Sequence, residues 1–432
     1  MLLNLCYLLV IIFALPWVAW RRLAGGRPVA APWQRFRGII TVPPPEAGGA
    51  RIWLHGVSVG EVQLLASLAA ELDRQATAAG RRIDSVISSS TTTGLEVAAR
   101  RFHAGRSFPC PLDFTWAVGR VLDHLRPDLL VLGELELWPN LLAAAQRRRI
   151  PVVIANARMS EKSCRGYGRV GWLAAAMLHK ITVVSARSQE DADRFTALGA
   201  RQVRVAGSMK FDGVRGDRDA SEVEQLRNQA GLTATDVVFL AGSTQAPEER
   251  LAAETYLALC EAHPALRLVI VPRHVERAGE IGSMLDGLGL TWQARSRLAA
   301  ETPNPAARVL LVDSTGELSW WWGTARIAFV GGSLDGSRGG QNMLEPAAYA
   351  AAVSFGPHTR NFRDEVARLQ AADAAVVVAD GPALTGFVAR CLKDPVWAAD
   401  LGQKAADLVA AQRGATAATA RLVLDLLPET AG

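Results

Sequence analysis

The fold of this chain is decided by RIWLHGVSVGEVQ, residues 51–63, which passes from a strand into a helix. The mostly apolar run from Arg51 to Val57 is typical of a buried strand, and small residues lead from it into a helical pattern. Ser58 and Glu61 match the Ser-x-x-Glu pattern of a capping box. Glu61 therefore has two interpretations: a member of a helix cap, or a catalytic acid beyond the end of a strand.

Short runs of Val, Ile and Leu alternate with alanine-rich helical stretches along the rest of the chain. Fully apolar strands that alternate with helices indicate parallel sheets covered on both faces. The predicted strands are 51–57, 83–89, 128–134, 151–157, 181–186 and 203–207 in the first half, and 236–242, 266–272, 309–313, 327–332, 351–356 and 374–379 in the second.

The length of 432 residues exceeds what one hydrophobic core usually supports, which predicts two α/β domains. A polar segment at 212–235 is the predicted linker. We expect a doubly wound parallel-sheet domain at 51–211 and a second one at 236–432, which includes the C-terminal helices.

The first 20 residues, Met1 to Trp20, contain no charged side chain and as a helix would span about 30 Å, enough to cross a bilayer core. Arg21 and Arg22 follow, whereas a cleaved signal peptide would begin with basic residues. We predict a membrane-anchor helix at 1–22 with the rest of the chain cytoplasmic, and a Pro/Gly-rich connector without folded structure at 23–50. A helix that lies in the membrane interface or is buried in protein is the alternative.

Net charge is +5, and the first 50 residues hold five arginines against one acid, Glu46. Basic residues beside an apolar segment favour an anionic lipid surface over nucleic acid as partner. The five cysteines are scattered without CxxC spacing, so neither a disulfide framework nor a zinc site is expected. Asp191 and Asp193 form a DxD, but Ser188 before them predicts a capped helix and not a metal site.

Polar side chains follow several predicted strands of the first half. Glu134 and Glu136 end the apolar run DLLVL, where an unpaired carboxylate would be costly to bury. If strand geometry persists, the two acids face the same side, and either can be the functional one. Lys210 follows the last strand of the first domain.

The second half has the same arrangement. Arg273 follows the strand at 266–272, where a guanidinium can bind a phosphate or form a surface ion pair. The run DSTGEL at 313–318 follows another strand. The loop GGSLDGSRGGQNMLEP at 331–346 contains glycines that let backbone N–H groups approach an anion. In the simpler interpretation of that loop, Asn342 caps a helix with Glu345 as its partner.

The ordered set of motifs is more specific than any one of them. HGVSVGEV, SSSTTTG, PLDF, GELELWPN, NARMSEKS, GSMKFD, AGSTQAPEE, VPRH, DSTGEL, FVGGSL, GGQNMLEPAA and FGPHTRNF together resemble the 3-deoxy-D-manno-octulosonic acid (Kdo) transferases of lipopolysaccharide synthesis. The resemblance runs from the predicted anchor to about residue 365. One departure lies near residue 245, where Gln245 and Pro247 replace the usual His and Gly.

The resemblance implies a GT-B fold of two Rossmann-like domains, the first binding the acceptor and the second the CMP-sugar. It implies CMP-Kdo as donor, a lipid A precursor as acceptor, and a position at the cytoplasmic face of the bacterial inner membrane. Glu61 resembles the proton acceptor, and Glu134 and Lys210 resemble residues that support the transition state. The residues that resemble CMP contacts are Pro272, Arg273, Thr315, Gly316, Glu317, Asn342, Met343, Leu344 and Glu345.

These assignments predict an inverting transfer with Glu61 as base and with neither a metal nor another cofactor, because a monophosphate leaving group has no diphosphate for a metal to clamp. Three alternatives remain open at this stage. They are a GT-B transferase that uses a UDP-sugar on a membrane lipid, a UDP-sugar epimerase, and a nucleotide-sugar binding protein without catalysis.

Overall fold

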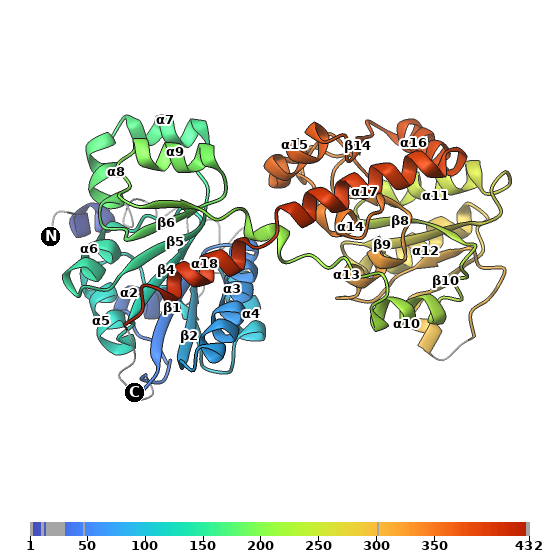
Figure 1. The fold of residues 1–432 in the computed structure, drawn as a ribbon. Helices are drawn as coiled ribbons and strands as arrows, with labels where there is room; N and C mark the ends of the chain where they lie inside the picture. The colour runs from blue at the N-terminus through green and yellow to red at the C-terminus, as the bar shows by residue number, and fades with distance from the viewer. Residues whose placement is uncertain (1–2, 10–12, 14–30, 46–47, 300–301, 429–432) are drawn as a thin grey trace. The chain divides into compact units, whose positions relative to one another are not determined.

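The computed structural model describes residues 3–9, 13, 31–45, 48–299 and 302–428, and they form two compact units. The first unit contains the described residues up to Gly213 and those from Arg413 onward, and the second runs from Val214 to Gln412. In each unit a parallel sheet is covered by helices (Figure 1). The prediction of two parallel-sheet α/β domains is confirmed.

The first unit is built on a seven-stranded parallel sheet in the order β3-β2-β1-β4-β5-β6-β7. Its strands are β1 (Ala50–Gly56), β2 (Ile83–Ser89), β3 (Ser107–Pro109), β4 (Leu129–Gly133), β5 (Val152–Ala157), β6 (Val183–Ala186) and β7 (Val203–Val205). Its helices are α2 (Pro32–Arg37), α3 (Val59–Ala78), α4 (Thr92–Arg101), α5 (Thr115–Leu125), α6 (Pro139–Arg147), α7 (Glu161–Gly168), α8 (Gly171–Leu178), α9 (Gln189–Ala197), the short 3₁₀ helix η1 (Met209–Phe211) and α18 (Ala415–Leu424).

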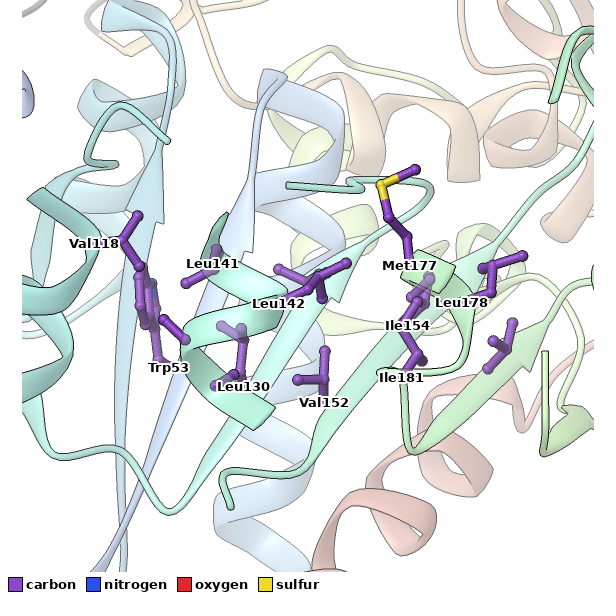
Figure 2. Packing of buried hydrophobic residues seen from close by; sticks show 14 of the residues in the cluster. Trp53, Val118, Leu130, Leu141, Leu142, Val152, Ile154, Met177, Leu178 and Ile181 are labelled. Carbon is purple, nitrogen blue, oxygen red and sulfur yellow. The ribbon is translucent and has the colours of Figure 1, made fainter. Parts of the chain in front are cut away.

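Alternate residues of these strands enter two cores, one on each face of the sheet. Trp53 and Leu130 pack on one face against α5 and α6, as Figure 2 shows with Val118 and Leu141. Ile52 and Val131 pack on the other face with residues of α3 and α18. Two buried faces explain why these strands are apolar at nearly every position.

The second unit has a seven-stranded parallel sheet in the order β10-β11-β9-β8-β12-β13-β14. Its strands are β8 (Val237–Thr244), β9 (Leu266–Pro272), β10 (Trp292–Ala294), β11 (Val309–Leu311), β12 (Ile327–Val330), β13 (Ala352–Phe355) and β14 (Val376–Val377). Its helices are α10 (Ser221–Gln229), α11 (Glu248–Leu259), α12 (Ala278–Gly287), α13 (Leu318–Trp321), α14 (Leu344–Ala348), α15 (Arg363–Ala371), α16 (Gly381–Lys393) and α17 (Pro395–Ala411).

The predicted strands all occur, with ends that differ by a few residues, but two strands were not predicted. The missed strands β3 and β10 have three residues each and lie at the outer edges of the two sheets. Their sequences, Ser-Phe-Pro and Trp-Gln-Ala, lack the runs of Val, Ile and Leu that identified the other strands. The DxD segment is the predicted helix: Ser188 caps α9 by accepting from the Asp191 amide, and Asp191 accepts from the Met159 amide.

The prediction of an unfolded connector at 23–50 is wrong for its described part. Helix α2 begins at Pro32, and Arg35 is buried and donates to the carbonyl of Cys110 at 2.8 Å. Phe36 packs edge-on against Phe114, with ring centroids 5.3 Å apart. Pro/Gly-rich composition predicts a spacer, but proline is well tolerated at the first position of a helix, as at Pro32.

Two further domain predictions are corrected by the structure. The segment 212–235 contains α10, and from Val214 onward it belongs to the second unit. The last helix, α18, was assigned to the second domain but belongs to the first, where it packs along α3. Its start is held by Asp212, which accepts from the Gly414 amide at 2.6 Å and the Thr416 amide at 2.5 Å.

The predicted anchor lies largely outside the described residues. Residues 3–9 are helical and join the first unit through polar side chains: Asn4 donates to the Thr115 hydroxyl at 2.7 Å, and Tyr7 donates to Asp113 at 3.0 Å. Within the described ranges, helices of the length and apolarity needed to span a membrane do not occur.

Candidate active site

In the first sheet, β2 and β3 extend from one side of β1, and the strands from β4 onward extend from the other side. The strand order therefore reverses between β1 and β4, which are neighbours in the sheet. Ligands of doubly wound sheets bind at such a switch point, beyond the carboxyl ends of the strands. Glu61 follows β1 and Glu134 follows β4, and both line one small pocket together with Gly133, Asn156 and Met209. The structure therefore brings two of the predicted catalytic acids together.

Glu61 closes a complete capping box at the start of α3. Its Oε1 accepts from the Ser58 hydroxyl at 2.7 Å and from the Ser58 amide at 3.3 Å, and its Oε2 accepts from the Val57 amide at 2.9 Å. The Glu61 amide in turn donates to the Ser58 hydroxyl at 3.2 Å. The carboxylate is therefore fixed in place by the turn that starts its own helix.

The cap leaves Glu61 with acceptor capacity toward the pocket. Oε2 receives one hydrogen bond, from Val57, whereas a carboxylate oxygen can accept two. Gly133 lies beside this oxygen: a Cβ at position 133 would be in van der Waals contact with Oε2, at 3.5 Å. The two interpretations of Glu61, as cap and as base, are thus compatible in this geometry.

The second pair of acids does not have the geometry that the strand pattern predicted. Strand β4 ends at Gly133, and Glu134 adopts a left-handed backbone with φ of 53°. Period-two alternation therefore stops before Glu134, and the expectation that Glu134 and Glu136 face the same side by strand geometry is wrong.

Arg187 is a residue of this site that was missed in the sequence. Its Nη2 forms an ion pair with Glu134 Oε1, and its Nε donates to the Asn156 carbonyl at 3.1 Å. The Arg187 side chain is 5% exposed and that of Glu134 34%. Arg187 directly follows β6, so the strand-end argument applied to Glu134 would have found it.

Asn156, at the end of β5, connects this ion pair to Lys210. Asn156 is buried with a left-handed φ of 56°, and its Oδ1 accepts from the Met209 amide at 3.0 Å. Met209 begins the turn η1 that carries Lys210. Asn156 Nδ2 and Arg187 Nη1 are buried and have no hydrogen-bond partner in the described structure, so this polar cluster retains donors for a ligand or water.

Glu136 is the acid of this segment with a raised pKa. Burial raises the pKa of Glu136 to about 7, and the negative charges of Glu61 and Glu134 act in the same direction. Glu134 forms an ion pair with Arg187, whereas Glu136 has a pKa at which it can gain or lose a proton near neutral pH. The two acids of GELELWPN therefore have different chemistry.

The switch point of the second sheet lies between β8 and β12. Here the carboxylate of Glu248, at the start of α11, accepts from four backbone amides. Its Oε2 accepts from the amides of Gln245 at 2.9 Å and Gly332 at 2.7 Å. Its Oε1 accepts from the amides of Ser333 at 3.0 Å and Leu334 at 3.1 Å. Glu248, which was also missed, thus shapes the first part of the predicted anion-binding loop.

The close approach of Glu248 explains one glycine of that loop. A Cβ at Gly331 would lie 2.6 Å from both Glu248 Oε2 and the Thr244 Cα, a clash that backbone atoms cannot relieve. Gln245, which departs from the family pattern, is buried and is held to Glu248 through its amide. The substitution at 245 is therefore accommodated in an ordered turn.

Pro272 ends β9, and the other residues that resemble CMP contacts follow β9, β11 and β12, so they all belong to the carboxyl edge of one sheet. Arg273 is exposed, and its amide donates to the Thr244 carbonyl at 2.9 Å. Glu317 is fixed by Arg295 at 3.1 Å and by the Ser314 hydroxyl at 2.5 Å. Pro272, Met343 and Leu344 are buried, whereas Thr315 and Gly316 are exposed.

Asn342 and Glu345 form a local pair, but not the predicted cap. Helix α14 begins at Leu344 without a side-chain cap, and Asn342 Oδ1 accepts from the Leu344 amide at 3.2 Å. Glu345 accepts from Asn342 at 3.2 Å and from the Trp322 indole at 3.1 Å. Burial raises the pKa of Glu345, while these two donors and the charge of Arg273 oppose the rise.

Comparison with known proteins identifies the family. Residues 32–213 match the family model described as 3-Deoxy-D-manno-octulosonic-acid transferase (kdotransferase). A 3-deoxy-D-manno-octulosonic acid transferase from Bordetella pertussis is 33% identical, over 96% of this chain and 95% of its own length. The chain belongs to the Kdo transferase family. It is a glycosyltransferase, and Kdo transfer replaces the UDP-sugar alternatives.

Two solved structures are similar to this Kdo transferase. The C-terminal CMP-Kdo binding domain of WaaA from Acinetobacter baumannii is 30% identical, covering 44% of this chain and 96% of that domain, with a TM-score of 0.41. UDP-GlcNAc 2-epimerase from Neisseria meningitidis, solved with UDP-GlcNAc, is 12% identical with a TM-score of 0.56, covering 87% of this chain and 99% of the epimerase. At that identity the likeness to the epimerase shows the fold alone.

Proposed function

We propose that this Kdo transferase moves Kdo from CMP-Kdo to a hydroxyl of a lipid A precursor by a single inverting, metal-independent displacement. Glu61 is the general base. The observation that carries the proposal is the carboxylate of Glu61, fixed at the switch point by two backbone amides and a hydroxyl, with Oε2 still able to accept a proton. These hydrogen bonds orient the carboxylate at the start of α3, so that it is held in place for an acceptor hydroxyl.

In the proposed step, Glu61 takes the proton of the acceptor hydroxyl as its oxygen attacks the anomeric carbon of Kdo. The new carbon–oxygen bond forms on one face, and the bond to the CMP phosphate breaks on the other. CMP leaves with the electron pair. Attack opposite the leaving group, without a covalent sugar–enzyme intermediate, inverts the anomeric carbon.

Positive charge supports the departing phosphate. Arg273 is exposed beyond β9 at the edge where the CMP contacts are proposed, and Lys210 is the second cation. Glu134, held by Arg187, is proposed to support the transition state beside the base. Because CMP leaves as a monophosphate, the step has no diphosphate for a metal to neutralise.

The acceptor accounts for the basic, apolar beginning of the sequence. A lipid A precursor is a phosphorylated lipid, and arginines beside an apolar segment attract anionic headgroups. We propose that this segment holds the enzyme at the cytoplasmic face of the inner membrane, where the first unit binds the acceptor and the second binds CMP-Kdo.

The test is transfer by the Glu61→Gln variant. Purified wild type, with CMP-Kdo and a tetra-acylated lipid A precursor, should add Kdo as measured by mass spectrometry, and Glu61→Gln should lose at least a thousandfold in rate. Thermal stabilisation by CMP should persist in the variant. Glu71→Gln, which removes another carboxylate of α3 that is paired with Arg74, is the matched control and should transfer normally. An active Glu61→Gln would reduce Glu61 to a helix cap.

A further inference from the structure

A second pocket lies in the second unit, at the edge of the sheet where the strands begin. Its lining includes Val237 and Ile327, the first residues of β8 and β12, and residues from α10, α16 and α17. Strand β8 is eight residues long, so its first and last residues are roughly 23 Å apart. This pocket is therefore separate from the proposed CMP site at the carboxyl edge.

Three arginines converge on this pocket: Arg218, Arg227 and Arg326. The lining contains no aspartate or glutamate. Among the described residues, the guanidiniums of Arg227 and Arg326 have no hydrogen-bond or ion-pair partner. Three cations without a counter-charge are the arrangement by which proteins bind phosphate groups.

Arg218 is fixed by the fold. Its guanidinium donates to the carbonyls of Gly323 at 2.8 Å, Ala325 at 2.6 Å and Tyr349 at 2.6 Å. These acceptors are neutral, so they orient the positive charge without cancelling it. The pKa of Arg218 is lowered to about 10, chiefly by burial and in part by the charges of Arg227 and Arg326. The cluster therefore carries repulsion that a bound anion would relieve.

The rest of the wall is apolar. Val237, Ile327 and Leu392 line the pocket, together with small side chains of α17 such as Ala398 and Ala399. A free inorganic anion would leave this apolar surface without a contact. A ligand with a phosphate at one end and a hydrocarbon portion at the other would bury the apolar wall and neutralise the arginines.

We propose that this pocket binds an anionic amphiphile, with its phosphate on Arg218, Arg227 and Arg326 and its alkyl portion against Val237, Ile327 and Leu392. The site is additional to the catalytic one, and the proposal does not depend on the role of Glu61. A phosphorylated lipid and a smaller alkyl phosphate have this chemistry in common.

Isothermal titration calorimetry with decyl phosphate, below its micelle threshold and with CMP at saturation, tests the proposal. Wild type should bind one decyl phosphate per chain, at least tenfold more tightly than inorganic pyrophosphate. Arg227→Gln and Arg326→Gln should each weaken binding roughly tenfold, the loss expected for one charge-assisted contact. Ala399→Phe should block binding without changing any charge, because it fills the pocket from α17.

Arg250→Gln is the matched control, since Arg250 is an exposed arginine of α11 outside the pocket that pairs with Glu254. It should bind decyl phosphate as wild type does, and all variants should retain stabilisation by CMP. Equal binding by wild type and the Arg227→Gln, Arg326→Gln double variant would overturn the site. Pyrophosphate binding as tightly as decyl phosphate would overturn the role of the apolar wall, and displacement by CMP would overturn a separate site.

Discussion

Arg187 and Glu134 form an ion pair across the carboxyl ends of β6 and β4, strands that are separated in the sheet by β5. The same guanidinium donates to the carbonyl of Asn156 on the intervening strand. Three strands are thus joined at the edge where Glu61 lies. The pair offsets one negative charge in a group of three carboxylates, those of Glu61, Glu134 and Glu136.

Arg187→Ala should lower kcat ten- to a hundredfold and leave the KM for CMP-Kdo nearly unchanged, because Glu134 loses its orientation while the second unit is untouched. The free energy of unfolding should fall by about 2 kcal/mol, less than for a fully buried pair because Glu134 is partly exposed. Steady-state kinetics and urea unfolding measure the two effects.

Two variants accompany that measurement. Arg187→Lys retains the positive charge but not the planar guanidinium with its several donors, and its kcat should lie between those of Arg187→Ala and wild type. Arg148→Ala breaks the exposed pair of Arg148 with Asp123 and should cost less than about 1 kcal/mol with full activity. A higher KM for CMP-Kdo in Arg187→Ala, with kcat unchanged, would contradict a positioning role at Glu134.

Glu136 should make stability depend on pH between about 4.5 and 7. Burial raises its pKa to about 7 in the folded protein, whereas the unfolded chain has the ordinary value of 4.5. Between these values the folded state binds more protons, so the free energy of unfolding falls as pH rises, by up to about 3 kcal/mol, and levels off above pH 7.

Urea unfolding from pH 5 to 8 measures the change of the free energy of unfolding with pH in wild type and in Glu136→Gln. The variant should show a smaller change with pH and should be more stable relative to wild type at pH 8 than at pH 5. Glu71→Gln should keep the wild-type slope, because Arg74 lowers the pKa of Glu71 to about 2, below the tested range. If Glu136→Gln retains the wild-type slope, the raised pKa belongs to another group.

Glu248→Ala should loosen the loop after β12. Four backbone amides lose their acceptor, and because buried unpaired donors are costly, we expect a loss of about 3 kcal/mol. Hydrogen exchange at Gly332, Ser333 and Leu334 should accelerate at least tenfold, and stabilisation by CMP should weaken.

Glu249→Ala provides the comparison. Glu249 is the next residue and is equally buried, but it pairs with the Arg277 side chain and not with the loop. It should lose stability without faster exchange at residues 332–334. Similar exchange in both variants would show that Glu248 does not hold the loop.

The elements were largely predictable because their signals are local. Long apolar runs identified the central strands, and the Ser58 to Glu61 spacing identified the start of α3. The order of motifs identified the family. Edge strands β3 and β10 were missed because their sequences, Ser-Phe-Pro and Trp-Gln-Ala, lack the Val, Ile and Leu runs that identified the other strands. Helix α18 was assigned to the wrong domain because its sequence does not indicate which surface it packs on.

The sequence by itself determined two parallel-sheet domains, the family, and the candidate acids Glu61 and Glu134, because periodicity and motif order can be read from consecutive residues. Only the tertiary structure decided which groups control those acids. Arg187 is 53 residues from Glu134, and Glu248 is 84 residues from Gly332. Such pairs form when parallel strands bring their carboxyl ends to one edge, which is a property of strand order and not of local sequence.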